Sequence, residues 1–171
     1  IKKGLTLAGQ HYEVKSLAID TWGVDFGLLD ESGRLIENPV CYRDERTRGI
    51  LTELSSVLSM PELFAQTGNT PDEINTLMQL AALKKQRPEV LERAHRLLFL
   101  PDLIGYFLTG RQACEFTIAS TSQCLNPQRT GIHEALLQRL GLRPQLFAPL
   151  RYPGEVLGCL KAEIAEECGL G

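Results

Sequence analysis

Six consecutive positions, residues 20–25, combine polar groups with one aromatic ring. Asp20 and Asp25 supply two carboxylates, Trp22 an indole, and Gly23 a position without a side chain. Carboxylates bind hydroxyl groups, an aromatic ring covers an apolar ligand face, and glycine lets the backbone approach closely. Together they could bind a small polyhydroxy compound. Because aromatic residues more often belong to cores, the alternative is that Trp22 is a core residue and the aspartates only flank strands.

A second cluster, residues 42–48, begins with Tyr42 and continues with charges of alternating sign. One interpretation is a solvated helix entry, where acidic residues favour the first turn. The other is that Arg43 and Asp44 face a cleft shared with Trp22. In that arrangement Tyr42 would be a second aromatic surface, and the charged groups would bind hydroxyls.

Both clusters need elements to position them. Residues 16–19 form a short apolar run, which predicts a buried strand. Over residues 24–28 apolar residues alternate with Asp25 and Gly27, and this period of two predicts a strand with one packed face. After a turn at Asp30–Gly33, residues 34–36 and 40–42 would return as a second arm.

Apolar spacing and capping residues predict mainly helices over the rest of the chain. Helices are expected over residues 50–58, 60–67, 76–85, 101–109, 132–140 and 160–168, with a short one after Pro88 and a short helix or ordered loop over 116–122. Strands are expected at 97–100 and 156–157. The prediction is one α/β domain over residues 1–171.

Composition excludes several classes of function. The net charge of −3 comes without a basic stripe, which disfavours a nucleic-acid partner. No apolar run has the length of a membrane span and no signal peptide opens the chain, so no membrane role is expected. Five cysteines without C-x-x-C spacing predict free thiols in a cytoplasmic protein. The three histidines lack metal-ligand spacing, and the glycines at 105 and 110 lack the Lys-Ser/Thr of a phosphate loop.

The order of the motifs resembles the FGGY family of carbohydrate kinases, and within it the rhamnulokinases. The similarity covers nearly the whole chain, and its most specific segment is Asp20-Thr21-Trp22-Gly23-Val24-Asp25. Further matching segments are Tyr42-Arg43-Asp44, Arg46-Thr47, Asn75-Thr76-Leu77, Gln79-Leu80, Pro101-Asp102, Leu108-Thr109-Gly110 and Pro153-Gly154.

The resemblance implies an actin-like (ribonuclease-H-like) α/β fold and the incomplete N-terminal, sugar-binding domain of a two-domain kinase. Such kinases transfer a phosphoryl group from ATP, with Mg²⁺, to the 1-hydroxyl of L-rhamnulose. Substrate contacts carry over to Gly23 first, then to Trp22 and Asp20, with Tyr42 and Asn75 as further candidates.

The chain also departs from the family pattern. Nothing before Ile19 matches the phosphate-facing Asp-x-Gly hairpin, and no His-Asp pair provides the catalytic aspartate. The expectation is therefore a domain truncated at both ends, with no catalytic residue, no metal site and no nucleotide site of its own, and inactive alone. Alternatives are a kinase for another ketose or deoxysugar, such as xylulose or fuculose, or a non-catalytic interaction module. Exposed sheet edges could support a homo-oligomer.

Overall fold

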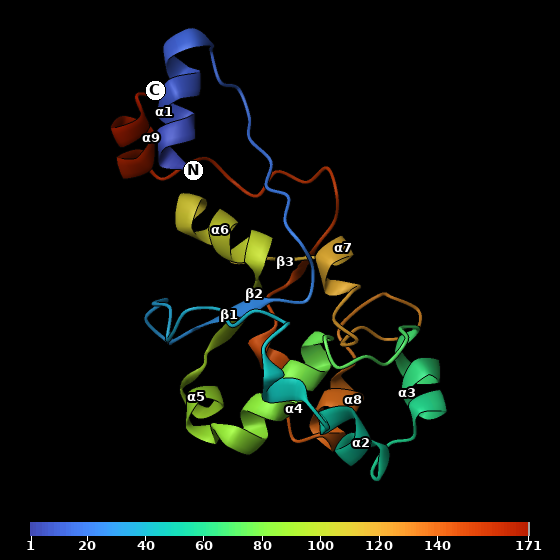
Figure 1. The fold of residues 1–171 in the computed structure, drawn as a ribbon. Helices are drawn as coiled ribbons and strands as arrows, with labels where there is room; N and C mark the ends of the chain where they lie inside the picture. Colours follow the sequence, from blue (N-terminus) through green and yellow to red (C-terminus); the bar gives the residue numbers. More distant parts are fainter. Residues whose placement is uncertain (171) are drawn as a thin grey trace.

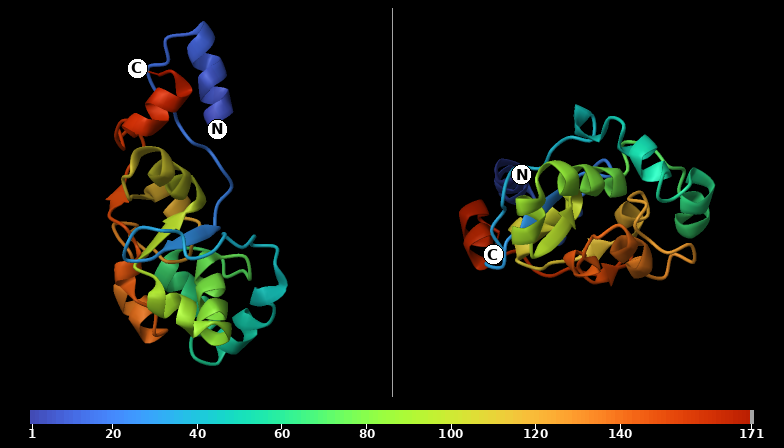
Figure 2. Two further views of the ribbon diagram at one scale, coloured as in Figure 1. Left: turned by 90° about the vertical axis from the view of Figure 1, so that its left-hand side faces the viewer. Right: turned by 90° about the horizontal axis from the view of Figure 1, so that it is seen from below.

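The computed structural model describes residues 1–170 and centres on a small antiparallel sheet (Figure 1). Strand β1 (Phe26–Leu29) pairs with β2 (Arg96–Phe99) in the register Phe26 to Phe99 and Leu29 to Arg96. All four residues of β1 are buried, so the prediction of a single packed face was wrong. Helix α6 (Leu100–Thr109) lies on one side of the pair and α4 (Thr76–Gln86) on the other (Figures 1 and 2).

The glycine in β1 explains how closely α6 approaches the sheet. A Cβ added at Gly27 would lie 2.7 Å from Cδ2 of Leu103 on α6. The side chains of Phe26, Leu28 and Leu98 join the main core, which extends down to α4. This core fixes the start of β1 relative to α4, and that relation decides the geometry of the site.

Around this centre lie the remaining elements, most of them helical. They are α1 (Lys2–His11), the 3-10 helix η1 (Glu45–Thr47), α2 (Ile50–Ser55), α3 (Met60–Thr67), α5 (Pro88–Arg93), α7 (Phe116–Ala119), α8 (Glu134–Arg139), the 3-10 helix η2 (Pro144–Leu146) and α9 (Ala162–Cys168). A second, parallel pair joins β3 (Cys114–Glu115) to β4 (Leu150–Arg151). Helices α1 and α9 pack together at one end of the molecule, with both termini (Figure 1). Within residues 1–170 no helix has the length and apolarity to cross a bilayer.

Local capping chemistry set the start of α3 and the ends of α3 and α6 as expected. Ser59 accepts the amide hydrogen of Glu62 at the start of α3, and Gly68 ends that helix in a left-handed conformation. Gly110 ends α6 in the same way. The predicted strand at 97–100 and the helices after Pro88 and Leu160 are also confirmed, to within a few residues at each end.

Three strand predictions were wrong. Residues 16–19 are extended but mostly exposed, with Leu17 at 41% exposure, and they lie outside the strands of the described chain. Val156 is 87% exposed and also lies outside any strand. The expected second arm is reduced to a single bridge between Leu29 and Leu35. Apolar content favours a strand only where a neighbouring strand completes its hydrogen bonds. Residues 16–19 and Val156 have no such neighbour within residues 1–170, and the second arm meets β1 through one bridge alone.

Candidate sugar-binding site

The bend at Gly23 and Val24 leads directly into β1 and has an uncommon backbone conformation. Val24 has a φ of 67°, which a β-branched residue rarely adopts because its side chain crowds the backbone. The amide of Asp25 donates to the carbonyl oxygen of Gly23 at 2.9 Å, so the chain reverses in a γ-turn. Such a conformation costs roughly 1–3 kcal/mol and persists only where the surroundings hold it.

Two side chains near the start of α4 hold the bend through the Val24 carbonyl oxygen. Thr76 Oγ1 donates to it at 2.8 Å and Gln79 Nε2 at 3.2 Å. Both residues are fully buried. Gln79 Oε1 in turn accepts from Nη2 of Arg46, on η1, at 2.6 Å. Since buried hydrogen bonds are costly to leave unmade, α4 and η1 together determine the shape of the bend.

Trp22 projects from this bend with 56% of its surface exposed. Its indole Nε1 donates to Oδ2 of Asp25 at 2.8 Å. Asp25 is only 3% exposed, and its Oδ1 has no hydrogen-bond partner among residues 1–170. The alternative that Trp22 is a core residue was therefore wrong. An exposed indole fixed at its polar end is suited to packing against a ligand.

Gly23 packs against the turn that follows α7. A Cβ at this position would lie 2.7 Å from Oγ1 of Thr121, which is itself bonded to the carbonyl oxygen of Ile118 at 2.8 Å. The glycine is thus needed for packing within the protein, a reason the sequence analysis did not foresee. Asp20, three residues earlier, has an exposed side chain on the same surface segment.

The two further candidates make contacts of different kinds. Asn75 is 7% exposed, and its Nδ2 donates to the Thr70 carbonyl at 3.0 Å and to Gln123 Oε1 at 3.2 Å. It directly precedes Thr76, so it belongs to the support of the bend. The Tyr42 hydroxyl accepts from Nε of the adjacent arginine at 3.0 Å. The aromatic pairs of the described chain do not join Tyr42 to Trp22. Sugar contact at both positions stays a prediction.

Arg46 brings a positive charge close to the bend. Burial lowers the pKa of its guanidinium, while the charges of Asp44, Asp25 and Glu37 act in the opposite direction. Its Nε has no hydrogen-bond partner among residues 1–170. Asp44 caps η1 by accepting the Arg46 amide hydrogen at 2.9 Å. The interpretation of residues 42–48 as a helix entry is thus confirmed.

Sequence reasoning missed the roles of Thr76, Gln79 and Arg46. A signal was present, because Thr76 and Gln79 are polar residues three apart in an otherwise apolar stretch of a predicted helix. Residues at this spacing lie on one helix face. What they would bind could not be inferred, since Val24 precedes Thr76 by 52 residues.

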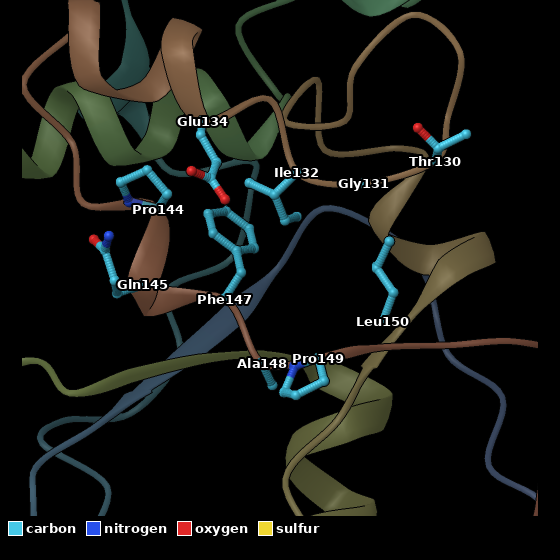
Figure 3. Close-up of a pocket in the computed structure, with 10 residues that line it drawn as sticks. All are labelled: Thr130, Gly131, Ile132, Glu134, Pro144, Gln145, Phe147, Ala148, Pro149 and Leu150. Atoms are coloured by element: carbon cyan, nitrogen blue, oxygen red, sulfur yellow. The ribbon is translucent and has the colours of Figure 1, made fainter.

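Two hollows lie elsewhere on the molecule. The first, of about 390 Å³, is lined by residues between Thr130 and Leu150, with Phe147 and Ile132 among them (Figure 3). Glu134 is its one ionisable lining residue. The second, of about 660 Å³, lies between the start of α1, α6 and α9. Neither is lined by any of residues 20–25, so the bend lies outside both hollows.

The described residues contain neither a cluster of metal ligands nor a phosphate loop. Within residues 1–170 no three His, Cys, Asp or Glu side chains gather in a way that could hold a metal ion. The glycine at 105 lies inside α6 and Gly110 ends it. A phosphate loop instead needs glycines between a strand and a helix, so these two glycines do not form one.

Comparison with known proteins decides the family. A profile of the FGGY family of carbohydrate kinases, N-terminal domain, matches residues 6–171. The chain belongs to the FGGY family of carbohydrate kinases. A rhamnulokinase from Bacteroides thetaiotaomicron is 39% identical over 169 residues, covering 98% of this FGGY chain and 35% of the relative. One from Enterococcus faecalis is 43% identical over 145 residues, covering 85% and 29%. This chain thus spans about a third of the length of the curated relatives it matches.

Solved structures place the fold of this FGGY chain. Gluconate kinase from Lactobacillus acidophilus superimposes with a TM-score of 0.89 at 19% identity, covering 99% of this chain and 35% of that structure. A carbohydrate kinase from Novosphingobium aromaticivorans gives a TM-score of 0.83 at 28% identity, with the same coverage. The expected α/β, actin-like class is confirmed, although the sheets of the described residues have only two strands each.

Proposed function

We propose that this chain is the sugar-binding part of a larger ATP-dependent kinase that phosphorylates L-rhamnulose on its 1-hydroxyl group. The proposal depends on one observation above all. Trp22 is exposed, yet its indole donates a hydrogen bond to the buried Asp25. It lies on a bend that a side chain of α4 fixes by a hydrogen bond to the Val24 carbonyl. The rhamnulokinase names of relatives at 39–43% identity support L-rhamnulose as the substrate.

The proposed contacts follow from the chemistry of the bend. The indole of Trp22 would cover the apolar face of the ketose, where its C–H bonds lie. Asp20 would accept hydrogen bonds from sugar hydroxyls, and the backbone of Gly23 would come close to the ligand because no side chain intervenes. Tyr42 and Asn75 are proposed as further contacts on the η1 and α4 sides.

Catalysis would need groups from outside residues 1–170. Phosphoryl transfer requires a positioned nucleotide, charge neutralisation and an acceptor for the hydroxyl proton. The family resemblance assigns ATP, Mg²⁺ and the catalytic aspartate to other parts of the kinase. We therefore expect this chain alone to bind sugar without turning it over.

The environment and self-association of the protein are part of the same proposal. All five cysteines are free thiols, as expected in a reducing compartment, so we propose a cytoplasmic location. The short β1–β2 sheet has edges that could pair with a second copy, and the oligomeric state in solution tests this.

A coupled assay of ADP release tests the function. With L-rhamnulose and Mg-ATP, this chain should give no turnover above background, whereas the longer kinase containing it should prefer L-rhamnulose to xylulose or fuculose. Trp22→Ala in that kinase should raise the KM for the sugar. Phe64→Ala, which removes another aromatic residue of similar exposure (52%) on α3, should not. Equal KM values in the two variants, or preference for another sugar, would overturn the assignment.

A further inference from the structure

Asp25 is a carboxylate in a position where packing alone would favour an apolar residue. It is 3% exposed, next to the buried Val24 and Phe26. Its backbone is fixed on both sides. Its amide donates to Gly23, and its carbonyl oxygen accepts the Leu100 amide hydrogen at 3.0 Å. A buried carboxylate destabilises a fold unless strong hydrogen bonds compensate, so the contacts of this side chain call for an explanation.

The side chain of Asp25 makes little use of its bonding capacity inside the protein. Oδ2 accepts from Trp22, whereas Oδ1 has no partner within residues 1–170. Arg46 is near enough for the two charges to interact, yet the described residues contain no ion pair between them. The indole is therefore the one side chain of residues 1–170 that this buried carboxylate binds.

The turn at Val24 makes this contact possible. In a regular strand, side chains three positions apart point to opposite faces, so Trp22 and Asp25 would diverge. The γ-turn at Val24 reverses the chain and brings the indole Nε1 to 2.8 Å from Oδ2. The hydrogen bonds from Thr76 and Gln79 to Val24 hold this turn, and they therefore indirectly hold the indole.

We propose that Asp25 is a positioning residue for sugar binding, because its carboxylate fixes the orientation in which the exposed ring of Trp22 meets the sugar. The inference rests on the proposed function. An exposed side chain otherwise samples several rotamers, and the entropy lost when the ligand orders it then weakens binding. A charged acceptor removes most of this freedom before the ligand arrives.

Spectroscopy on this chain tests the positioning without any sugar, since Trp22 is its single tryptophan. Asp25→Leu, if folded by far-UV circular dichroism, should lower the fluorescence anisotropy of Trp22. Asp25→Asn keeps an acceptor and should restore most of it. Asp30→Asn, which changes the aspartate following the other end of β1, should match the wild type. In the wild type, the indole N–H should exchange with solvent more slowly than in free indole. Fast exchange, or unchanged anisotropy in folded Asp25→Leu, would overturn the inference.

Kinetics of the longer kinase separate the two proposals. Asp25→Leu should raise the KM for the sugar about tenfold, the loss expected for one hydrogen bond to a charged group. The KM for ATP should stay unchanged, and kcat should change less than the KM for the sugar. Asp25→Asn should recover most of the sugar affinity. Wild-type enzyme that accepts no ketose would refute the proposed function and leave the spectroscopic result standing. Active enzyme with an unchanged sugar KM in Asp25→Leu would refute the positioning role.

Discussion

Asp102 should make the stability of this domain fall as the pH rises towards neutrality. It lies in the first turn of α6 and is 6% exposed. Its oxygens accept the Glu115 amide hydrogen at 3.1 and 3.3 Å. Burial raises the pKa of the Asp102 carboxyl from 3.8 to about 7, and the Glu115 charge adds to the effect, although the amide hydrogen bond opposes it.

The size of the effect follows from the linkage between proton binding and folding. Between about pH 4 and pH 7 the folded chain holds a proton on Asp102 that the unfolded chain has released. The associated stability is fully present below the unfolded pKa and is lost as the pH rises through the folded one. Each pH unit in this window removes up to about 1.4 kcal/mol, so the whole shift amounts to about 4 kcal/mol.

Asp102→Asn keeps the shape and the acceptor but cannot ionise. The variant should lose this pH dependence and be more stable than the wild type at about pH 8, with the difference vanishing towards about pH 4. Urea unfolding curves across this range measure it. Asp30→Asn is a control, because Asp30 is less buried and hydrogen bonds lower its pKa. If Asp102→Asn retains the wild-type decline, burial of Asp102 does not govern it.

Three further variants test the site and its supports. Gly23→Ala should destabilise the chain and weaken sugar binding, because the new methyl group meets Thr121 Oγ1 at 2.7 Å; urea unfolding and the sugar KM measure the two effects. Thr76→Val removes one of the two side-chain hydrogen bonds to the Val24 carbonyl and should cost about 0.5–1.5 kcal/mol, because Gln79 still donates to that oxygen; an unchanged unfolding midpoint would show that Gln79 alone suffices. Ser59→Ala removes a helix cap and should cost about 1 kcal/mol, with no change in sugar KM.

Several helix ends and the family could be inferred from the sequence, because both depend on residues that lie close together along the chain. A cap such as Ser59 or a stop such as Gly110 acts through groups within a few residues, so its chemistry can be inferred locally. The cluster at residues 20–25 is also contiguous, and it resembles a motif of the family that the profile match confirmed. Strands were less accessible. Residues 16–19 have strand-forming side chains, but pairing depends on what lies beside them.

The sequence by itself determined the family and most of the helices after residue 50, and it singled out the six residues of the bend as candidates, whereas α1 was not predicted. Only the tertiary structure decided how that bend is held. Thr76 meets Val24 across 52 residues, and Arg46 reaches Gln79 across 33. The contact between the buried Asp25 and the exposed Trp22 likewise depends on the positive φ of Val24, which hydrogen bonds from α4 hold in place. Contacts between distant segments arise only when the core brings them together, because local preferences carry no information about such partners.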